Sequence, residues 1–211
     1  MTTELRLNAQ VVCADGPAGH LTDVILDPIS DQVTHLVVEV EGFGRPQHLV
    51  PVTLVLATST TREVRLQCSR AELQQTEFFT EAEPIPLDPS TAALMVDDTL
   101  AWPLAFPQFA TLLVEHERVP PGELAVHRDT RVEASDGPVG RLDAFVLHLE
   151  DDRVADVILR RGHLWRRSEV VVPATAIHHI DAEGVHLKLP KAWVHALPVT
   201  RRESVALPDS A

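Results

Sequence analysis

Aromatic residues are scarce in this chain, and tyrosine is missing altogether. Phenylalanine and tryptophan together supply 4% of the 211 residues. Proteins that bind single-stranded nucleic acid stack successive bases on aromatic side chains, and sugar sites use similar aromatic platforms. The composition therefore weighs against a protein built to hold bases or sugars.

Positive charge is also in short supply. The chain has 18 basic and 31 acidic side chains, which gives a net charge of −13. Binding to nucleic acid depends on lysine and arginine that neutralise phosphates, so we expect no DNA binding and regard RNA as an unfavourable partner. Acidity by itself names no other partner.

Several kinds of segment are also lacking. There are only two cysteines, Cys13 and Cys68, which is too few for a disulfide framework, and we expect both thiols to be reduced. No apolar run approaches the roughly 18 residues of a membrane helix. The first residues lack the basic and then apolar pattern of a signal peptide. We therefore expect a soluble, cytoplasmic protein without membrane insertion.

An internal repeat is the main feature that is present. Residues 14–21 read ADGPAGHL, and residues 135–142 read SDGPVGRL. Without a gap, 8 of the 25 positions in 14–38 are identical to their counterparts in 135–159, at an offset of 121 residues. The offset returns where residues 64–66 (VRL) match residues 185–187 (VHL). The sequence therefore predicts two copies of one module.

Each copy is rich in short stretches of β-branched and aliphatic residues separated by turn residues, which is typical of strands. In the first copy these stretches are residues 11–13, 19–26, 33–40, 47–50 and 64–68; in the second they are 130–134, 139–149, 154–160, 168–172 and 185–189. Five or six short strands per copy predict a mainly β fold of two small antiparallel β-barrels.

A short helical segment ends each copy. Ser69 and Glu72 have the spacing of a capping box, and Pro190 suits the first turn of a helix. We expect barrel 1 at residues 1–79, a proline-rich connector at 80–122, barrel 2 at 123–198 and a disordered polar tail at 199–211. The connector carries many apolar residues, so we expect it to be ordered and favour a position packed against the barrels.

The two copies resemble the PRC-barrel family. The resemblance rests on DGPAGHLTDVILD (15–27), on VTHLVV (33–38) and on Val50-Pro51, and it covers residues 5–79 and 126–197. The second copy departs from the pattern, since Ala144 replaces Asp23 and residues 148–149 (HL) replace Asp27-Pro28. The family includes the cytoplasmic domain of the photosynthetic reaction-centre H subunit, the C-terminal domain of the ribosome-maturation factor RimM, and many stand-alone bacterial and archaeal proteins. The resemblance implies a tandem β-barrel protein that docks onto a larger partner.

Residues with catalytic or metal-binding potential do not form a known motif. We interpret the repeated glycine turns as structural hairpin turns rather than phosphate loops, because strands follow them where a phosphate site needs a helix; they are Asp15, Gly16, Gly19, Asp136, Gly137 and Gly140. Cys13 and Cys68 are expected to be buried, inert thiols. The 11 histidines show no zinc-site spacing, and the adjacent His178 and His179 are expected on opposite faces of a strand. We therefore expect no enzyme activity, no cofactor and no metal.

Two segments are candidate binding sites. A basic loop in the second copy combines arginines with a tryptophan, residue types that dominate protein interfaces. The loop is therefore a candidate site for a partner; alternatively, its arginines pair with the protein's own carboxylates. Its candidate residues are Arg160, Arg161, His163, Trp165, Arg166 and Arg167. The corresponding residues 39–46 of the first copy begin with acidic side chains, so the two loops are also candidates to clasp each other or to pair two chains. In the connector, Trp102 and Phe106 are either an exposed interaction site or part of the core between the barrels.

Three functions remain open from the sequence. The leading hypothesis is a non-enzymatic scaffold or adaptor that binds another protein, with homo-oligomerisation as a possible mode. The alternatives are a ribosome or RNA-processing assembly factor, by analogy with RimM, and a module that senses a small ligand or a metal. A fold alone does not decide among them.

Overall fold

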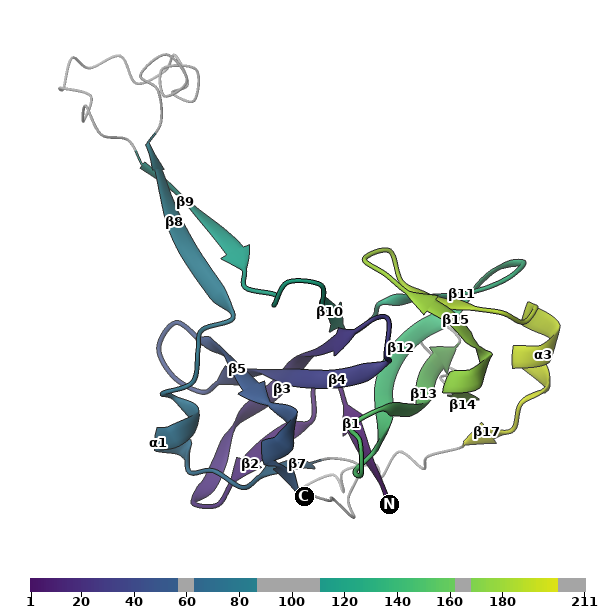
Figure 1. The fold of residues 1–211 in the computed structure, drawn as a ribbon, viewed down its shortest axis with the longest axis horizontal. Coiled ribbons are helices and arrows are strands. Elements are labelled where there is room, and N and C mark those ends of the chain that lie inside the picture. Colours follow the sequence, from purple (N-terminus) through teal and green to yellow (C-terminus); the bar gives the residue numbers. More distant parts are fainter. Residues whose placement is uncertain (57–62, 87–110, 162–167, 201–211) are drawn as a thin grey trace, which may run out of the picture.

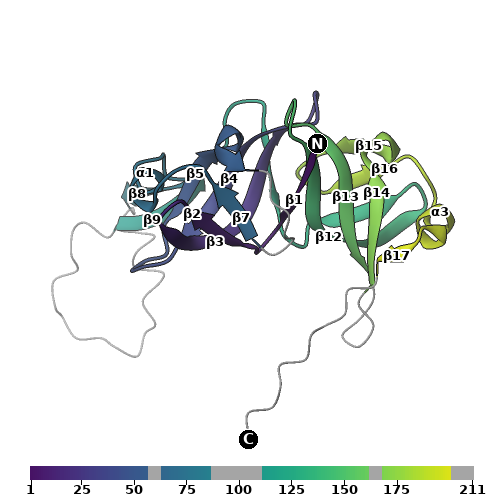
Figure 2. The same cartoon turned by 90° about the horizontal axis from the view of Figure 1, so that it is seen from below.

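The structure is a computed structural model that describes residues 1–56, 63–86, 111–161 and 168–200. It is mainly β, as the sequence predicts, and two large sheets form two lobes that lie side by side (Figures 1 and 2). Residues 57–62, 87–110, 162–167 and 201–211 lie outside the described ranges.

The first sheet is built from the first copy. Its strand order is β5 (Gln47–Pro51), β4 (Gln32–Val40), β3 (Gly16–Asp27), β2 (Gln10–Cys13), β7 (Glu63–Leu66) and β6 (Val55–Leu56). A short 3₁₀ turn, Val52–Leu54, follows β5. The strands predicted from sequence match five of these six closely, and β6 is the one that was missed.

The second sheet repeats this arrangement. Its order is β15 (Ile177–Ile180), β16 (Val185–Leu187), β11 (Arg131–Ala134), β12 (Gly137–His148), β13 (Val154–Arg161), β14 (Ser168–Pro173) and β17 (Val199–Thr200). In both sheets one pair is parallel, β2 with β7 and β11 with β16. The predicted antiparallel pairing thus holds for the other strand pairs of both sheets, and the same parallel pair in both halves supports the repeat.

The two sheets exchange a strand. The first strand of the chain, β1 (Thr2–Arg6), pairs antiparallel with β12 of the second sheet. The strand β10 (Leu124–His127) pairs antiparallel with β3 of the first sheet. At the repeat offset Leu5 corresponds to Val126, and they lie opposite Phe145 and Val24. The exchange is thus reciprocal and keeps the same register in both halves.

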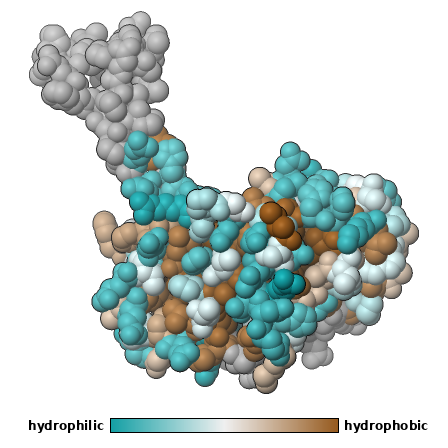
Figure 3. Space-filling model, viewed as in Figure 1, coloured by the Kyte–Doolittle hydropathy of each residue, from teal (hydrophilic) through white to brown (hydrophobic). Residues whose placement is uncertain are grey.

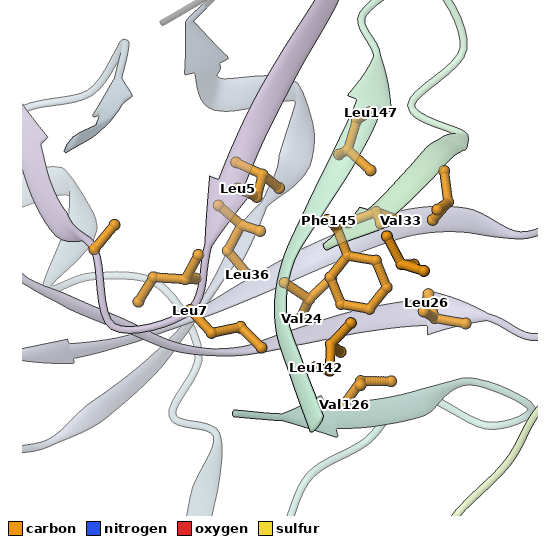
Figure 4. Close-up of a cluster of buried hydrophobic side chains, with 14 of the residues drawn as sticks. Leu5, Leu7, Val24, Leu26, Val33, Leu36, Val126, Leu142, Phe145 and Leu147 are labelled. Atoms are coloured by element: carbon orange, nitrogen blue, oxygen red, sulfur yellow. The ribbon is translucent and has the colours of Figure 1, made fainter. Parts of the chain in front are cut away.

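Both exchanged strands carry buried side chains into one shared core. A single cluster of buried hydrophobic residues runs through both lobes. Figure 4 shows its centre, where Leu5 and Phe145 lie close to Val24, Val33 and Leu36 of the first sheet. The two lobes therefore share one continuous hydrophobic core. Among the described strands, neither sheet forms a closed barrel.

The repeated turn residues have a second task in the structure. Gly16 and Gly137 adopt φ values of 132° and 122°, which side chains disfavour, and each follows a tight turn at residues 14–15 or 135–136. The carboxylate of Asp15 accepts a 2.9 Å hydrogen bond from the backbone N–H of Arg70. Asp136 accepts the equivalent bond from Lys191, at 2.7 Å. Each turn therefore fastens the helix that ends its module.

Gly19 and Gly140 have a different role from the turn glycines. They lie within β3 and β12, where a Cβ would come within 2.0 Å of the Glu39 carbonyl oxygen or 2.7 Å of the Arg160 carbonyl oxygen. Close strand approach therefore requires glycine at these two positions, which lie within the strands predicted over 19–26 and 139–149.

The helical segments follow the prediction. The helix α1 (Arg70–Leu73) begins at Ser69, whose side chain accepts a hydrogen bond from the Glu72 N–H while the Glu72 carboxylate accepts one from the Ser69 N–H. This is the predicted capping box. The helix α3 (Lys191–Ala196) follows Pro190.

The ends of the connector form an arm. Strands β8 (Thr80–Pro86) and β9 (Thr111–Glu117) pair with each other and with no other described strand. The arm leaves the first lobe beside Phe79, which is buried against Ile25, Val37 and Leu49, and projects away from the body (Figure 1). Val119 of the connector packs partly against this cluster, whereas strands β8 and β9 stand apart from both sheets. Trp102 and Phe106 lie outside the described residues.

Candidate functional site

The two described arginines of the predicted basic loop bind within the protein. Arg160 forms an ion pair with Asp129 and is largely buried. Arg161 donates a hydrogen bond of 3.2 Å to the carbonyl oxygen of Val194. Pairing with the protein's own carboxylates was one of the two interpretations of this loop; Arg160 pairs in this way, whereas Arg161 binds a backbone carbonyl.

The rest of that loop lies outside the described residues, namely His163, Trp165, Arg166 and Arg167. In the corresponding segment of the first copy, Arg45 pairs with Glu39 at 3.3 Å, and Phe43 is fully exposed. The described backbone contacts that join the two halves come from the exchanged strands and from the segments 31–33 and 152–154, which bond to each other. The hypothesis that the two loops clasp each other has no support in the described ranges.

A His–Asp pair lies where β10 meets β3. The Nδ1 atom of His127 contacts a carboxylate oxygen of Asp23, which is buried, and its Nε2 atom lies 3.9 Å from Glu117. A hollow of about 320 Å³ opens beside the pair, and Arg128 also lines it. Such a pair in a hollow can orient a histidine for proton transfer.

The other half of the molecule offers a comparison. Arg6 occupies the position equivalent to His127, and it contacts buried Asp143 as well as Glu169, at 2.9 Å. Guanidinium has no acid–base role at neutral pH. Because a cation on each exchanged strand meets a buried aspartate in the opposite sheet, we interpret both pairs as fasteners of the exchange.

The His127 pair makes stability depend on pH. The hydrogen bond to Asp23 raises the pKa of His127, with nearby Glu117 adding to the effect. A raised folded-state pKa gives stability that is complete below the unfolded value of about 6.5 and is lost as pH rises through the folded value. Substituting His127→Gln should therefore lower the free energy of unfolding more at pH 6 than at pH 9, measured by urea denaturation.

The control for this prediction is His116→Gln, because His116 lies on the arm, 3.7 Å from exposed Glu83. Its substitution should leave the pH profile of the parent unchanged. Equal destabilisation by His127→Gln at pH 6 and pH 9 would contradict a pH-dependent contribution of the His127–Asp23 pair to stability.

A second cluster unites residues that the sequence left apart. His179, Asp181 and His186 place their ligand atoms within 4.8 Å of one another. The expectation that His178 and His179 point to opposite faces is wrong, because β15 has an irregular register between Ile177 and His179. Their rings lie 4.9 Å apart and both line one hollow. The third member, Asp181, lies in the turn between the two strands, and histidine and cysteine spacing in the sequence does not indicate it.

The two cysteines are free and buried, as predicted. Burial raises the pKa of the Cys13 thiol to about 12, and the neighbouring Cys68 adds to the shift. Because the thiolate is the reactive form, Cys13 is an inert core residue at neutral pH.

Comparisons with known proteins do not identify a family for this chain. Neither the protein-family models nor the curated proteins gave a match to this chain. The resemblance to PRC-barrel proteins therefore stays a prediction. Within the described residues, no helix has both the length and the apolar character needed to cross a membrane.

Proposed function

We propose that this chain is a non-enzymatic, cytoplasmic scaffold that binds another protein and consists of two PRC-barrel-like modules. The observation that carries the proposal is the arm formed by β8 and β9. The body supplies a fixed base for it through the exchanged strands and the shared core.

The arm has the properties of a strand-addition site. An isolated two-stranded hairpin is marginally stable in water, and the described residues of the arm show no third strand on either edge. The part of the arm nearest the body is hydrophilic on the face shown in Figure 3, and Arg118 at its base pairs with Glu81 at 2.6 Å. Unpaired edges are templates for another chain.

The two edges of the arm are not equivalent. Strand β8 contains Pro84 and Pro86, which have no N–H to donate. Strand β9 contains no proline. We therefore propose that an extended segment of the partner pairs with β9.

Removal of the arm should abolish partner binding and leave the body folded. Thr80 and Glu117 are paired across the arm, so a short glycine-containing turn can replace residues 81–116. We expect a partner recovered with the intact chain from its native cell to be lost with the armless chain, by affinity capture and mass spectrometry. Circular dichroism should show that the body of the armless chain is folded.

A point substitution tests whether the partner pairs with the edge of β9 or only requires that the arm is present. Leu113 lies opposite Pro84, which cannot donate, so we expect the Leu113 N–H to point outward from the hairpin. Leu113→Pro should therefore block strand addition, whereas Leu113→Ala should keep it. Recovery of the same partner by the armless chain would overturn the proposal that the arm binds it.

A further inference from the structure

The hairpin of β15 and β16 brings two histidines and an aspartate together. His179 and His186 are opposite each other across the two strands. Their rings are stacked, with centroids 4.4 Å apart. Asp181 follows β15 directly, at the start of the turn that leads to β16.

The turn fixes the aspartate in place. The Oδ1 atom of Asp181 accepts hydrogen bonds from the backbone N–H groups of Glu183, at 2.8 Å, and Gly184, at 3.0 Å. The Nε2 atom of His179 lies 3.2 Å from Oδ2, and the Nε2 atom of His186 lies 3.3 Å from Oδ1. The carboxylate therefore stands between two imidazole nitrogens on a rigid turn.

These separations suit a transition metal. With zinc bonds of about 2.0–2.2 Å, the ligand atoms of a tetrahedral site lie about 3.3 Å apart. Two imidazoles and one carboxylate are a ligand set that zinc accepts, with an open fourth position. We propose that His179, Asp181 and His186 form a binding site for a divalent transition metal ion such as Zn²⁺.

The surroundings leave room for the ion. A hollow of about 500 Å³ adjoins both histidines, and His178, Glu133 and Lys188 also line it. His179 is half exposed and His186 is partly exposed. Both Nε2 atoms already lie beside the Asp181 carboxylate, and the exposed side of the cluster leaves the fourth position to water.

The first copy shows that the fold itself does not require these histidines. At the repeat offset, the counterpart of His186 is Arg65. Arg65 lies in β7 at the same parallel pairing and contacts Glu63 at 3.6 Å. The proposed metal-binding residues are thus specific to the second module, and the fold accommodates an arginine at the position of His186.

Titration of the full, tag-free chain with zinc chloride tests the site. After treatment with chelator and dialysis, calorimetry should show saturable binding of one zinc ion per chain, and zinc should raise the melting temperature. His186→Arg, which copies the first module, should weaken zinc binding by at least about tenfold, since loss of even an outer-shell partner costs that much. His179→Gln should do the same, whereas the control His20→Gln, on β3 of the first sheet, should bind as the parent does.

Melting of each variant in chelator shows whether it is folded. If His186→Arg fails to fold, His179→Gln decides the question, because His179 lies at the surface. Absence of saturable binding at micromolar zinc, or binding by both variants equal to that of the parent, would overturn the proposal.

Discussion

A chain that lacks residues 2–7 should lose structure in its second sheet, although these residues belong to the first copy of the repeat. β1 forms a ladder with β12 over five residue pairs. Leu5 and Leu7 are fully buried, and burial of two leucine side chains contributes about 3–6 kcal/mol. That is a large part of the 5–15 kcal/mol that stabilises a typical domain.

The loss of Arg6 adds to this effect. Asp143 is buried, and its other cation, Arg128, lies 3.9 Å away. Removing one partner of a buried ion pair costs about 3–5 kcal/mol, and the more distant Arg128 would offset only part of this cost. The truncation should therefore unfold the second sheet at temperatures where the intact chain is stable.

Hydrogen exchange followed by mass spectrometry can locate this change. We expect amides in β12 and β13 to lose protection in the truncated chain, and a synthetic peptide of residues 1–9 to restore it. Phe43→Ala is the control, because Phe43 is fully exposed in a loop of the first copy. Unchanged protection of β12 after truncation would show that β1 does not belong to the second sheet.

The strand exchange is the part of the fold that the sequence could not predict. The repeat, most strands, both repeated turns and the capping box at Ser69 were visible as local patterns. However, β1 and β10 occupy equivalent positions of the repeat, and so do their partners β12 and β3. Because the hydrophobic pattern of either strand fits either partner, pairing within one copy and pairing between copies look the same in the sequence.

The candidate sites were predictable to different degrees. The turn aspartates Asp15 and Asp136 stood out because each is followed by glycine at the same place in both copies. The metal-binding cluster did not, because it depends on strand register and on an irregular pairing near His178. Sequence spacing assigns neighbouring residues to opposite faces, and only the pairing itself shows that His178 and His179 line one hollow.

Substitution of Phe145 by alanine should destabilise both halves of the protein together. Phe145 is fully buried on β12, and its ring lies beside Val24, Val33 and Leu26 of the first sheet (Figure 4). Truncation of a buried phenylalanine to alanine costs about 3–5 kcal/mol, from lost burial and from the cavity that remains. The cavity would lie between the sheets, so neither half would keep its packing.

Thermal unfolding with a probe in each half measures this coupling. In the parent chain, exchange protection in β4 and in β13 should disappear in one transition, because one core serves both sheets. In Phe145→Ala, both should disappear at a lower temperature, while Phe43→Ala should leave both unchanged. A lower melting temperature for β13 alone would mean that the halves unfold independently. In that case only the first lobe would support the proposed binding arm.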